Sequence, residues 1–125
     1  MSEKAAVSGK PLRARVGLRL WLETDDGVLV GPGRVELLRK VDELGSIKKA
    51  AEAMSMSYRA AWGKIKKTED VLGEKIVSPR GSNRRGCGLT DAGRALLSGF
   101  LALQSEVLAN ARESAATAFS WVEKP

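Results

Sequence analysis

Two short amphipathic segments joined by a three-residue turn are the feature that most restricts the fold of this chain. The first segment follows Gly45, and we expect Ser46 to be its N-cap. The second follows the turn "SMS" (55–57), and Ser57 is expected to cap it by accepting hydrogen bonds from backbone N–H groups. Their apolar stripes recur at helical spacing: Ile47, Ala50, Ala51 and Met54 in the first, and Ala61, Ile65 and Leu72, with Thr68 between them, in the second. This pattern predicts a helix-turn-helix.

The outer face of the second helix in this pair is cationic and aromatic. With the apolar stripe turned inward, Tyr58, Arg59 and Trp62 are left facing outward, together with Lys64 and Lys66. Early residues of a recognition helix reach base edges in duplex DNA. We therefore expect Arg59 to contact a base, most favourably guanine, and Tyr58 and Trp62 to meet thymine methyl groups or pack on sugar-phosphate. Partial burial against the following hairpin is an equally open role for Trp62.

Further basic and hydroxyl side chains are expected to contact the DNA backbone. Ser46 and Lys48, at the start of the first helix, are placed to touch phosphates, although simple solvation also explains Lys48 and Lys49. On the second helix the residues expected to neutralise phosphates are Lys64, Lys66 and Lys67.

A basic hairpin is predicted directly after the helix-turn-helix, in "EKIVSPRGSNRRGCGLT" (74–90). "KIV" (75–77) has the composition of a strand, "GLT" (88–90) of its partner, and Pro79–Cys87 of a flexible loop. Arginine can fork onto phosphate or enter a narrow minor groove, so this hairpin is interpreted as a DNA-binding wing. An exposed polar hairpin, with arginines for solubility, is the alternative. The arginines of the loop are Arg80, Arg84 and Arg85.

The charge balance favours a polyanionic partner and makes an enzyme the minority interpretation. The net charge is +6, and the stretch 57–85 holds eight basic against three acidic residues. A solvated surface is the other explanation for such a cluster. The chain has no histidine, the commonest general base and transition-metal ligand, and its single cysteine cannot build a zinc site. We therefore expect no catalytic residues, no metal and no cofactor.

The N-terminal part predicts a leader followed by a small hairpin. Residues 1–14 are interpreted as a flexible leader. "RVGLRLWLE" (15–23) alternates apolar and polar residues, as a half-buried strand does, and Asp26-Gly27 is a tight-turn pair before a short second strand at 28–30. After "GPG" (31–33), apolar residues at helical spacing predict a helix that Gly45 ends.

A long C-terminal helix is predicted from Thr90 to about residue 118. It carries one apolar stripe at Leu96, Phe100, Leu103, Val107 and Ala111, and beside it a second at Leu97, Leu101 and Leu108. One stripe suffices for the domain's own core, so the second predicts a dimer interface, with a thick core around this helix as the alternative. Residues 119–125 are interpreted as a tail, although Phe119 and Trp121 could cover an apolar surface.

The predicted fold is therefore mostly α with a small β component. It is a winged helix-turn-helix over residues 15–118, with an N-terminal strand or hairpin and a long C-terminal dimerisation helix. No run of 18 apolar residues and no secretory signal occurs, and the lone cysteine suits a reducing compartment. The sequence thus predicts a cytoplasmic protein without membrane contact.

From about Val16 to Ala111 the sequence resembles the winged-helix DNA-binding domain of the molybdate-responsive ModE family of bacterial regulators. The resemblance rests on "GSIKKAAEAMSMSYRAAWGKIKKTEDVLG" (45–73), "KIV" and "GLTDAG" (88–93), and "SYRAAW" (57–62) is its most ModE-like segment. LysR-type regulators are more distantly similar through "GSI", the alanine pair and "LTDAG". The resemblance implies transcriptional control by a dimer on a two-fold operator. By position it makes Ser57, Tyr58, Arg59 and Trp62 groove-facing.

The chain departs from the full-length family pattern after the DNA-binding domain. Family members place molybdate-binding modules there, whereas this chain ends where those would begin, so molybdate binding by this chain is in doubt. Several interpretations stay open. The chain could be a stand-alone short form that senses through a partner, a constitutive DNA binder, or a piece of a longer protein. A winged-helix module for protein–protein interaction is the competing function, and small-anion binding in the dimer interface is a third.

Overall fold

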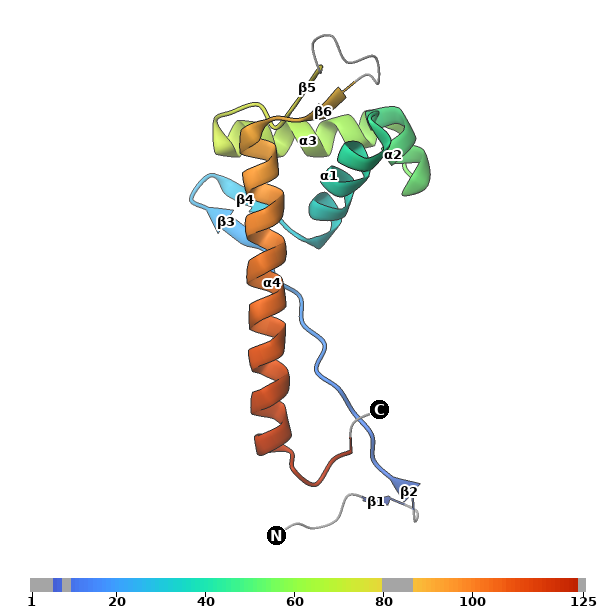
Figure 1. Ribbon diagram of the computed structural model, residues 1–125, viewed down its shortest axis with the longest axis vertical. Helices are drawn as coiled ribbons and strands as arrows, with labels where there is room; N and C mark the ends of the chain where they lie inside the picture. Colours follow the sequence, from blue (N-terminus) through green and yellow to red (C-terminus); the bar gives the residue numbers. More distant parts are fainter. Residues whose placement is uncertain (1–5, 8–9, 80–86, 124–125) are drawn as a thin grey trace. The chain divides into compact units, whose positions relative to one another are not determined.

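The computed structural model describes residues 6–7, 10–79 and 87–123 of the 125-residue chain. Its elements follow in the order β1, β2, β3, β4, α1, α2, α3, β5, β6 and α4 (Figure 1). The chain divides into two compact units, Leu20–Leu101 and the pair of segments Met1–Arg19 and Ala102–Pro125. The sequence-based domain boundaries, at residues 14 and 118, stay a prediction.

Three helices form the centre of the unit Leu20–Leu101. α1 (Pro32–Leu44) packs against α2 (Ile47–Ala53), and α2 packs against α3 (Tyr58–Leu72). The predicted helix-turn-helix is therefore confirmed. The side chains of these helices, with Ile76 from the following hairpin, build an apolar core whose most deeply buried members are Leu37, Leu38, Val41, Ala50, Ala51, Ala61, Ile65 and Ile76.

Local chemistry starts and ends these helices. The hydroxyl of Ser46 accepts a hydrogen bond from the backbone N–H of Lys49 at 3.1 Å, and that of Ser57 accepts from Ala60 at 3.0 Å, so both predicted N-caps are confirmed. Gly45 ends α1 in the left-handed conformation, with φ of 70°. Ser55, in the turn between α2 and α3, has φ of 56°, a conformation that ordinarily favours glycine.

The predicted hairpin after α3 is present. β5 (Val77–Pro79) pairs antiparallel with β6 (Cys87–Leu89). The first strand begins two residues later than the predicted strand 75–77, and the second ends one residue earlier than the predicted strand 88–90. Residues 80–86, which connect these strands, lie outside the described residues. Of the predicted wing, the structure therefore describes the two paired strands at its base.

The predicted N-terminal hairpin is shorter than the alternating pattern suggested. β3 (Leu22–Thr24) pairs antiparallel with β4 (Gly27–Val30), but residues 15–21 form no strand. An alternating sequence becomes a strand only where a partner satisfies its backbone. β4 offers four residues, and Leu18 and Trp21 remain 46% and 49% exposed. The prediction of a strand over 15–23 is thus wrong for all but its last two residues.

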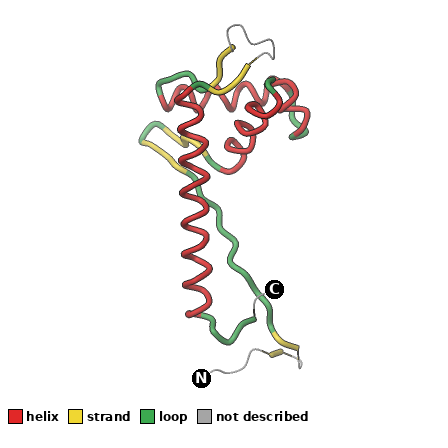
Figure 2. The backbone as a smooth tube through the Cα atoms, viewed as in Figure 1, coloured by secondary structure: helices red, strands yellow, loops and turns green. Residues whose placement is uncertain are grey.

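The predicted C-terminal helix is present as α4 (Asp91–Ala118), a continuous helix of 28 residues (Figure 2). Among the described residues no helix, α4 included, is long and apolar enough to cross a membrane. After α4 the chain returns to residues 12–14. The N–H of Ala14 donates to the Glu123 carbonyl at 2.9 Å, and the N–H of Glu123 donates to the Leu12 carbonyl at 2.9 Å. β1 (Ala6–Val7) and β2 (Lys10–Pro11) form a separate two-stranded pair.

Candidate nucleic-acid interface

The outer face of α3 carries the aromatic and basic side chains that the sequence assigned to it. Tyr58 is 55% exposed and Trp62 38% exposed, so Trp62 is more than half covered but keeps a free surface. Arg59 is exposed as well. The other exposed basic residues of this helix are Lys64, Lys66 and Lys67.

The charges on this face are largely uncommitted within the described structure. Lys66 is paired with Asp70 at 3.3 Å, one turn along the helix, and both side chains are more than half exposed. Solvent-exposed pairs of this kind contribute little, so Lys66 remains able to exchange Asp70 for another anion. For Arg59, Lys64 and Lys67 the described residues provide no ion pair. The face can therefore present several positive charges to a polyanion.

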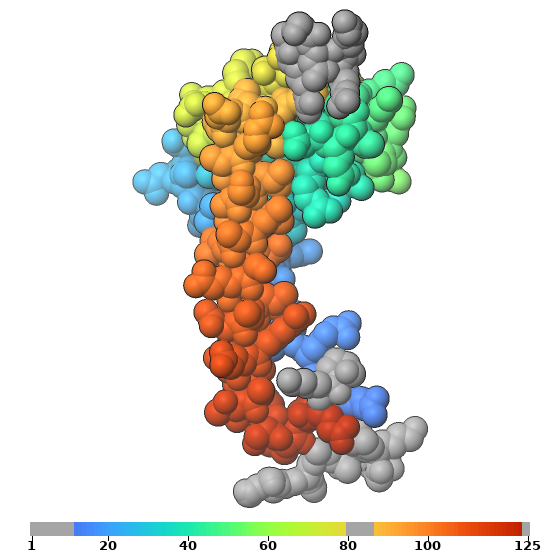
Figure 3. All heavy atoms as spheres, in the orientation of Figure 1, coloured from blue at the N-terminus to red at the C-terminus, as the bar shows by residue number. Residues whose placement is uncertain are grey.

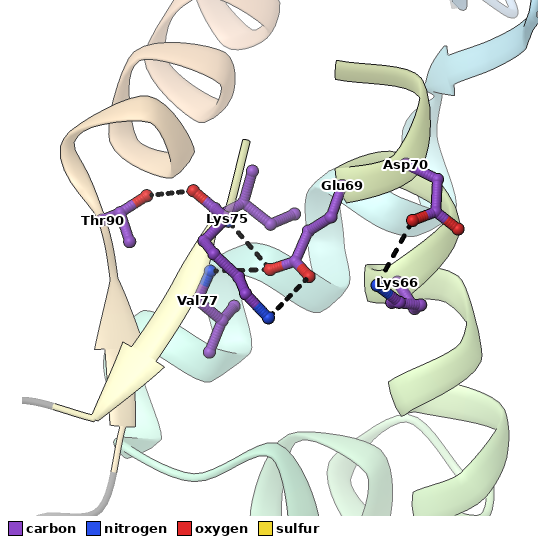
Figure 4. A network of polar contacts seen from close by, with 7 residues as sticks. Lys66, Glu69, Asp70, Lys75, Val77 and Thr90 are labelled. Carbon is purple, nitrogen blue, oxygen red and sulfur yellow. Dashed lines mark hydrogen bonds and ion pairs between the residues drawn. The ribbon is translucent and has the colours of Figure 1, made fainter. Parts of the chain in front are cut away.

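Glu69 fixes α3 to the base of the hairpin, and sequence reasoning missed this residue. Its Oε2 atom accepts hydrogen bonds from the backbone N–H groups of Ile76 at 2.9 Å and Val77 at 3.4 Å (Figure 4). The residue is 5% exposed. Lys75 reaches the other carboxylate oxygen at 4.0 Å, but its side chain is 69% exposed. A detectable signal was its position four residues after buried Ile65, on the inward face of the helix.

Thr90 fixes the same hairpin to α4. Its hydroxyl donates to the Lys75 carbonyl at 2.8 Å and accepts from the N–H of Gly93 at 3.0 Å, while its own N–H donates to the Ile76 carbonyl at 3.0 Å (Figure 4 draws the Lys75 contact). Gly93 is required for this approach, because a Cβ there would overlap the Ile76 carbonyl oxygen. The segment "LTDAG" is thus a joint between hairpin and helix.

Thr68, next to Glu69 on the buried face of α3, holds this helix against the N-terminal hairpin. Its hydroxyl, almost fully buried, donates to the Leu29 carbonyl at 2.8 Å. Arg34 donates to the Thr68 hydroxyl at 3.2 Å and to the Val28 carbonyl at 3.1 Å. Together with the Glu69 contacts, these bonds fix the C-terminal half of α3 to the N-terminal hairpin and to the base of the β5–β6 hairpin. In the N-terminal half, Ala61 is buried, whereas the side chains of Tyr58, Arg59 and Trp62 are exposed.

Three of the remaining predicted contact residues, Ser46, Lys48 and Ser57, lie on α2 or beside its ends. The residues of α2 and of the turn that follows it form one side of the visible surface of this unit (Figure 3). Lys48 and Ser57 are exposed, and Ser46 is partly buried. The two serine hydroxyls accept cap bonds and each retains a proton that it can donate. Arg80, Arg84 and Arg85 lie outside the described residues.

The predicted dimer-interface residues divide between two environments. Leu97 and Leu101 are partly buried and pack against the small core formed by Val30, Val35 and Phe100 of the same chain. Leu108 is also partly buried. Two of the three leucines therefore already serve the chain's own core, and their role in a dimer stays a prediction. In the described part of the chain, no cluster of three acidic or cysteine side chains is arranged to hold a metal ion.

Comparison with known proteins agrees with this geometry. Residues 33–94 match the family of bacterial regulatory helix-turn-helix proteins of the lysR type. The chain is 36% identical over 90 residues to the molybdenum transport protein ModE of Azotobacter vinelandii. The chain carries a ModE/LysR-like winged-helix DNA-binding domain. The ModE match covers 70% of this chain and 33% of that protein.

The chain is also similar to a second molybdenum-related protein and to a solved DNA-binding domain. The molybdenum-pterin-binding protein MopB of Rhodobacter capsulatus is 34% identical over 83 residues, covering 65% of this chain and 31% of MopB. The chain thus spans about a third of the length of these relatives. Among solved structures, the DNA complex of the CbnR DNA-binding domain superposes with a TM-score of 0.54 at 23% identity, over 69% of this chain and 95% of that one. That likeness confirms the predicted winged-helix fold class.

Proposed function

We propose that this chain is a sequence-specific, double-stranded DNA-binding transcriptional regulator that uses α3 as its recognition helix. The observation that carries the proposal is the asymmetry of α3. Ala61, Ile65, Thr68 and Glu69 are buried and fix the helix, whereas its opposite face presents exposed basic and aromatic side chains. A helix held this way matches the dimensions of the major groove, which is about 12 Å wide.

Each outward residue then has a role that follows from its chemistry. Arg59 reads a base edge, because a guanidinium can donate two parallel hydrogen bonds to guanine. Tyr58 and Trp62, both partly exposed, pack against thymine methyl groups or sugars. Ser46, Lys48, Ser57, Lys64, Lys66 and Lys67 contact phosphates, and Arg80, Arg84 and Arg85 extend the contact from the wing.

The chain acts as a homodimer on a two-fold operator, with Leu108 and the exposed parts of Leu97 and Leu101 contributing to the interface. Apolar residues on the C-terminal part of α4, among them Leu108, are only partly buried within the chain. This supports the proposal, because a second subunit would stabilise an apolar helix face by covering it. The protein is not an enzyme and works in the cytoplasm without a resident cofactor.

Salt dependence of DNA binding tests the proposal. A dimer that neutralises about 6–10 phosphates should lose about 10³–10⁵ in affinity between 50 and 200 mM salt. The measurement is fluorescence anisotropy with duplexes enriched from genomic fragments by the parent protein. A nearly flat response would contradict the proposal.

Arg59→Ala separates base reading from general attraction. Loss of a bidentate base contact should cost about 1–3 kcal/mol on the enriched duplex, or about 5- to 150-fold in affinity. Arg39→Ala is the matched control, because Arg39 is exposed on α1 and its removal changes the net charge equally. If Arg59→Ala, Arg39→Ala and the triple alanine variant of Arg80, Arg84 and Arg85 all bind like the parent, a protein-interaction role replaces this one.

A further inference from the structure

The outward face of α3 contains a glycine, Gly63, that neither the backbone conformation nor the packing of the chain requires. Gly63 is exposed in the middle of this 15-residue helix. A Cβ built on it would meet no atom within 4 Å, and its φ is in the range open to all residues. Glycine in a helix interior lowers the folding equilibrium constant about two- to fivefold relative to alanine. Gly63 therefore weakens the helix and relieves no crowding within the chain.

The surroundings of Gly63 indicate what the missing side chain makes room for. Residues three and four positions away are its neighbours on a helix surface. These neighbours are Arg59 and Ala60 on one side and Lys66 and Lys67 on the other, and all four are exposed. A gap one side chain deep is thus framed by three cations. A polyanion is attracted by that frame and can approach the helix backbone at its centre.

A second open glycine shows that the cationic frame, and not the glycine alone, distinguishes this position. Gly99 also lies exposed within a helix, and a Cβ there would likewise meet nothing within 4 Å. Its neighbours three and four positions away on α4 are alanines and leucines, without any charge. Gly99 shares the helical cost of Gly63 but has no features that attract nucleic acid.

We infer that Gly63 is a specificity-determining position, where the backbone of α3 comes into van der Waals contact with the floor or wall of the DNA major groove. This inference rests on the proposed function and adds a point of closest approach to it. Since the groove is barely wider than a helix with its side chains, removing one side chain lets α3 lie deeper. Arg59 then reaches base edges while Lys66 and Lys67 reach phosphates.

Gly63→Ala and Gly99→Ala test the inference as a matched pair. The probes are a duplex selected by the parent chain from a random-sequence library, and an unselected duplex of the same length. Gly63→Ala should raise the folding equilibrium constant about two- to fivefold, as measured by urea denaturation. It should weaken binding to the selected duplex about 5- to 150-fold, the range expected when one methyl group overfills a packed contact. Binding to the unselected duplex, which is mainly electrostatic, should remain within about threefold.

The control and the alternatives have distinct outcomes. Gly99→Ala should be stabilised similarly and bind both duplexes like the parent. If Gly63→Ala binds the selected duplex like the parent, the inference is overturned and the proposed function stands. A destabilised Gly63→Ala, or an equal loss of binding in Gly99→Ala, also overturns it. If the parent chain enriches no duplex at all, the proposed function fails and the inference fails with it.

Discussion

Replacing Glu69 with alanine should destabilise the protein more than any exposed charge change on α3. The substitution leaves the backbone N–H groups of Ile76 and Val77 without the carboxylate oxygen that accepts from them at 2.9 and 3.4 Å. Both residues are buried, at 0% and 8% exposure, so water cannot readily replace the acceptor. An orphaned buried donor costs about 1–3 kcal/mol. Loss of the weaker 3.4 Å bond from Val77 adds a smaller cost, and removal of the buried negative charge offsets part of the total. The free energy of unfolding should therefore fall by about 2–4 kcal/mol.

The ion pair with Lys75 is too weak to account for such an effect. The two charged atoms are 4.0 Å apart, and the Lys75 side chain is 69% exposed, so solvent screens the attraction. Lys75→Ala should therefore change the free energy of unfolding by less than about 1 kcal/mol. Glu69→Gln, which retains one oxygen acceptor, should fall between the two variants.

Urea denaturation followed by tryptophan fluorescence and circular dichroism measures these differences. With a slope of about 1–3 kcal/mol per molar urea, a loss of about 3 kcal/mol lowers the midpoint by about 1–3 M. The reasoning would be refuted if Glu69→Ala unfolds at the parent's midpoint, or if Lys75→Ala is the more damaging change. Either result would mean that the backbone hydrogen bonds do not hold the hairpin base to α3.

Two further stability predictions follow from the joints of the domain. Gly93→Ala should lower the free energy of unfolding by about 1–3 kcal/mol, because its Cβ would overlap the Ile76 carbonyl oxygen. This cost should exceed the gain from alanine's better helix propensity. Unchanged stability in the same denaturation assay would show that no such close approach exists. Ser57→Ala should cost about 1 kcal/mol by removing the cap bond to the Ala60 N–H, and thermal melting monitored by circular dichroism should detect it; a variant that melts like the parent would exclude an energetic role for this cap.

Sequence patterns predicted the helices of this domain well because helices are local. Ser46 and Ser57 accept hydrogen bonds from residues three positions later, so their capping role depends only on neighbouring residues. Gly45 and Gly73 end α1 and α3 in left-handed conformations, which glycine adopts at no steric cost. The orientation of α3 also followed from its apolar spacing. The exposed face with Arg59 was therefore predictable from the order of residues along one helix.

Features that depended on partners far along the chain were harder to predict. The alternation at 15–21 resembles a strand, but among the described residues no neighbouring strand accepts its backbone hydrogen bonds. Leu97 and Leu101 looked surplus to one core, yet they pack with Phe100 on Val30 and Val35, which lie some 60 to 70 positions earlier in the sequence. The number of apolar stripes on a helix does not indicate how much of the helix surface its neighbours in the fold will cover.

The amino-acid sequence by itself determined where helices start, stop and turn their charged faces, since those choices depend on side chains within about one helical turn. Only the tertiary structure decided that a glutamate belongs inside. Glu69 is buried because the N–H groups of Ile76 and Val77, seven and eight residues later, come to its carboxylate. A charged group can remain buried only where such donors converge, and their convergence is a property of the folded chain.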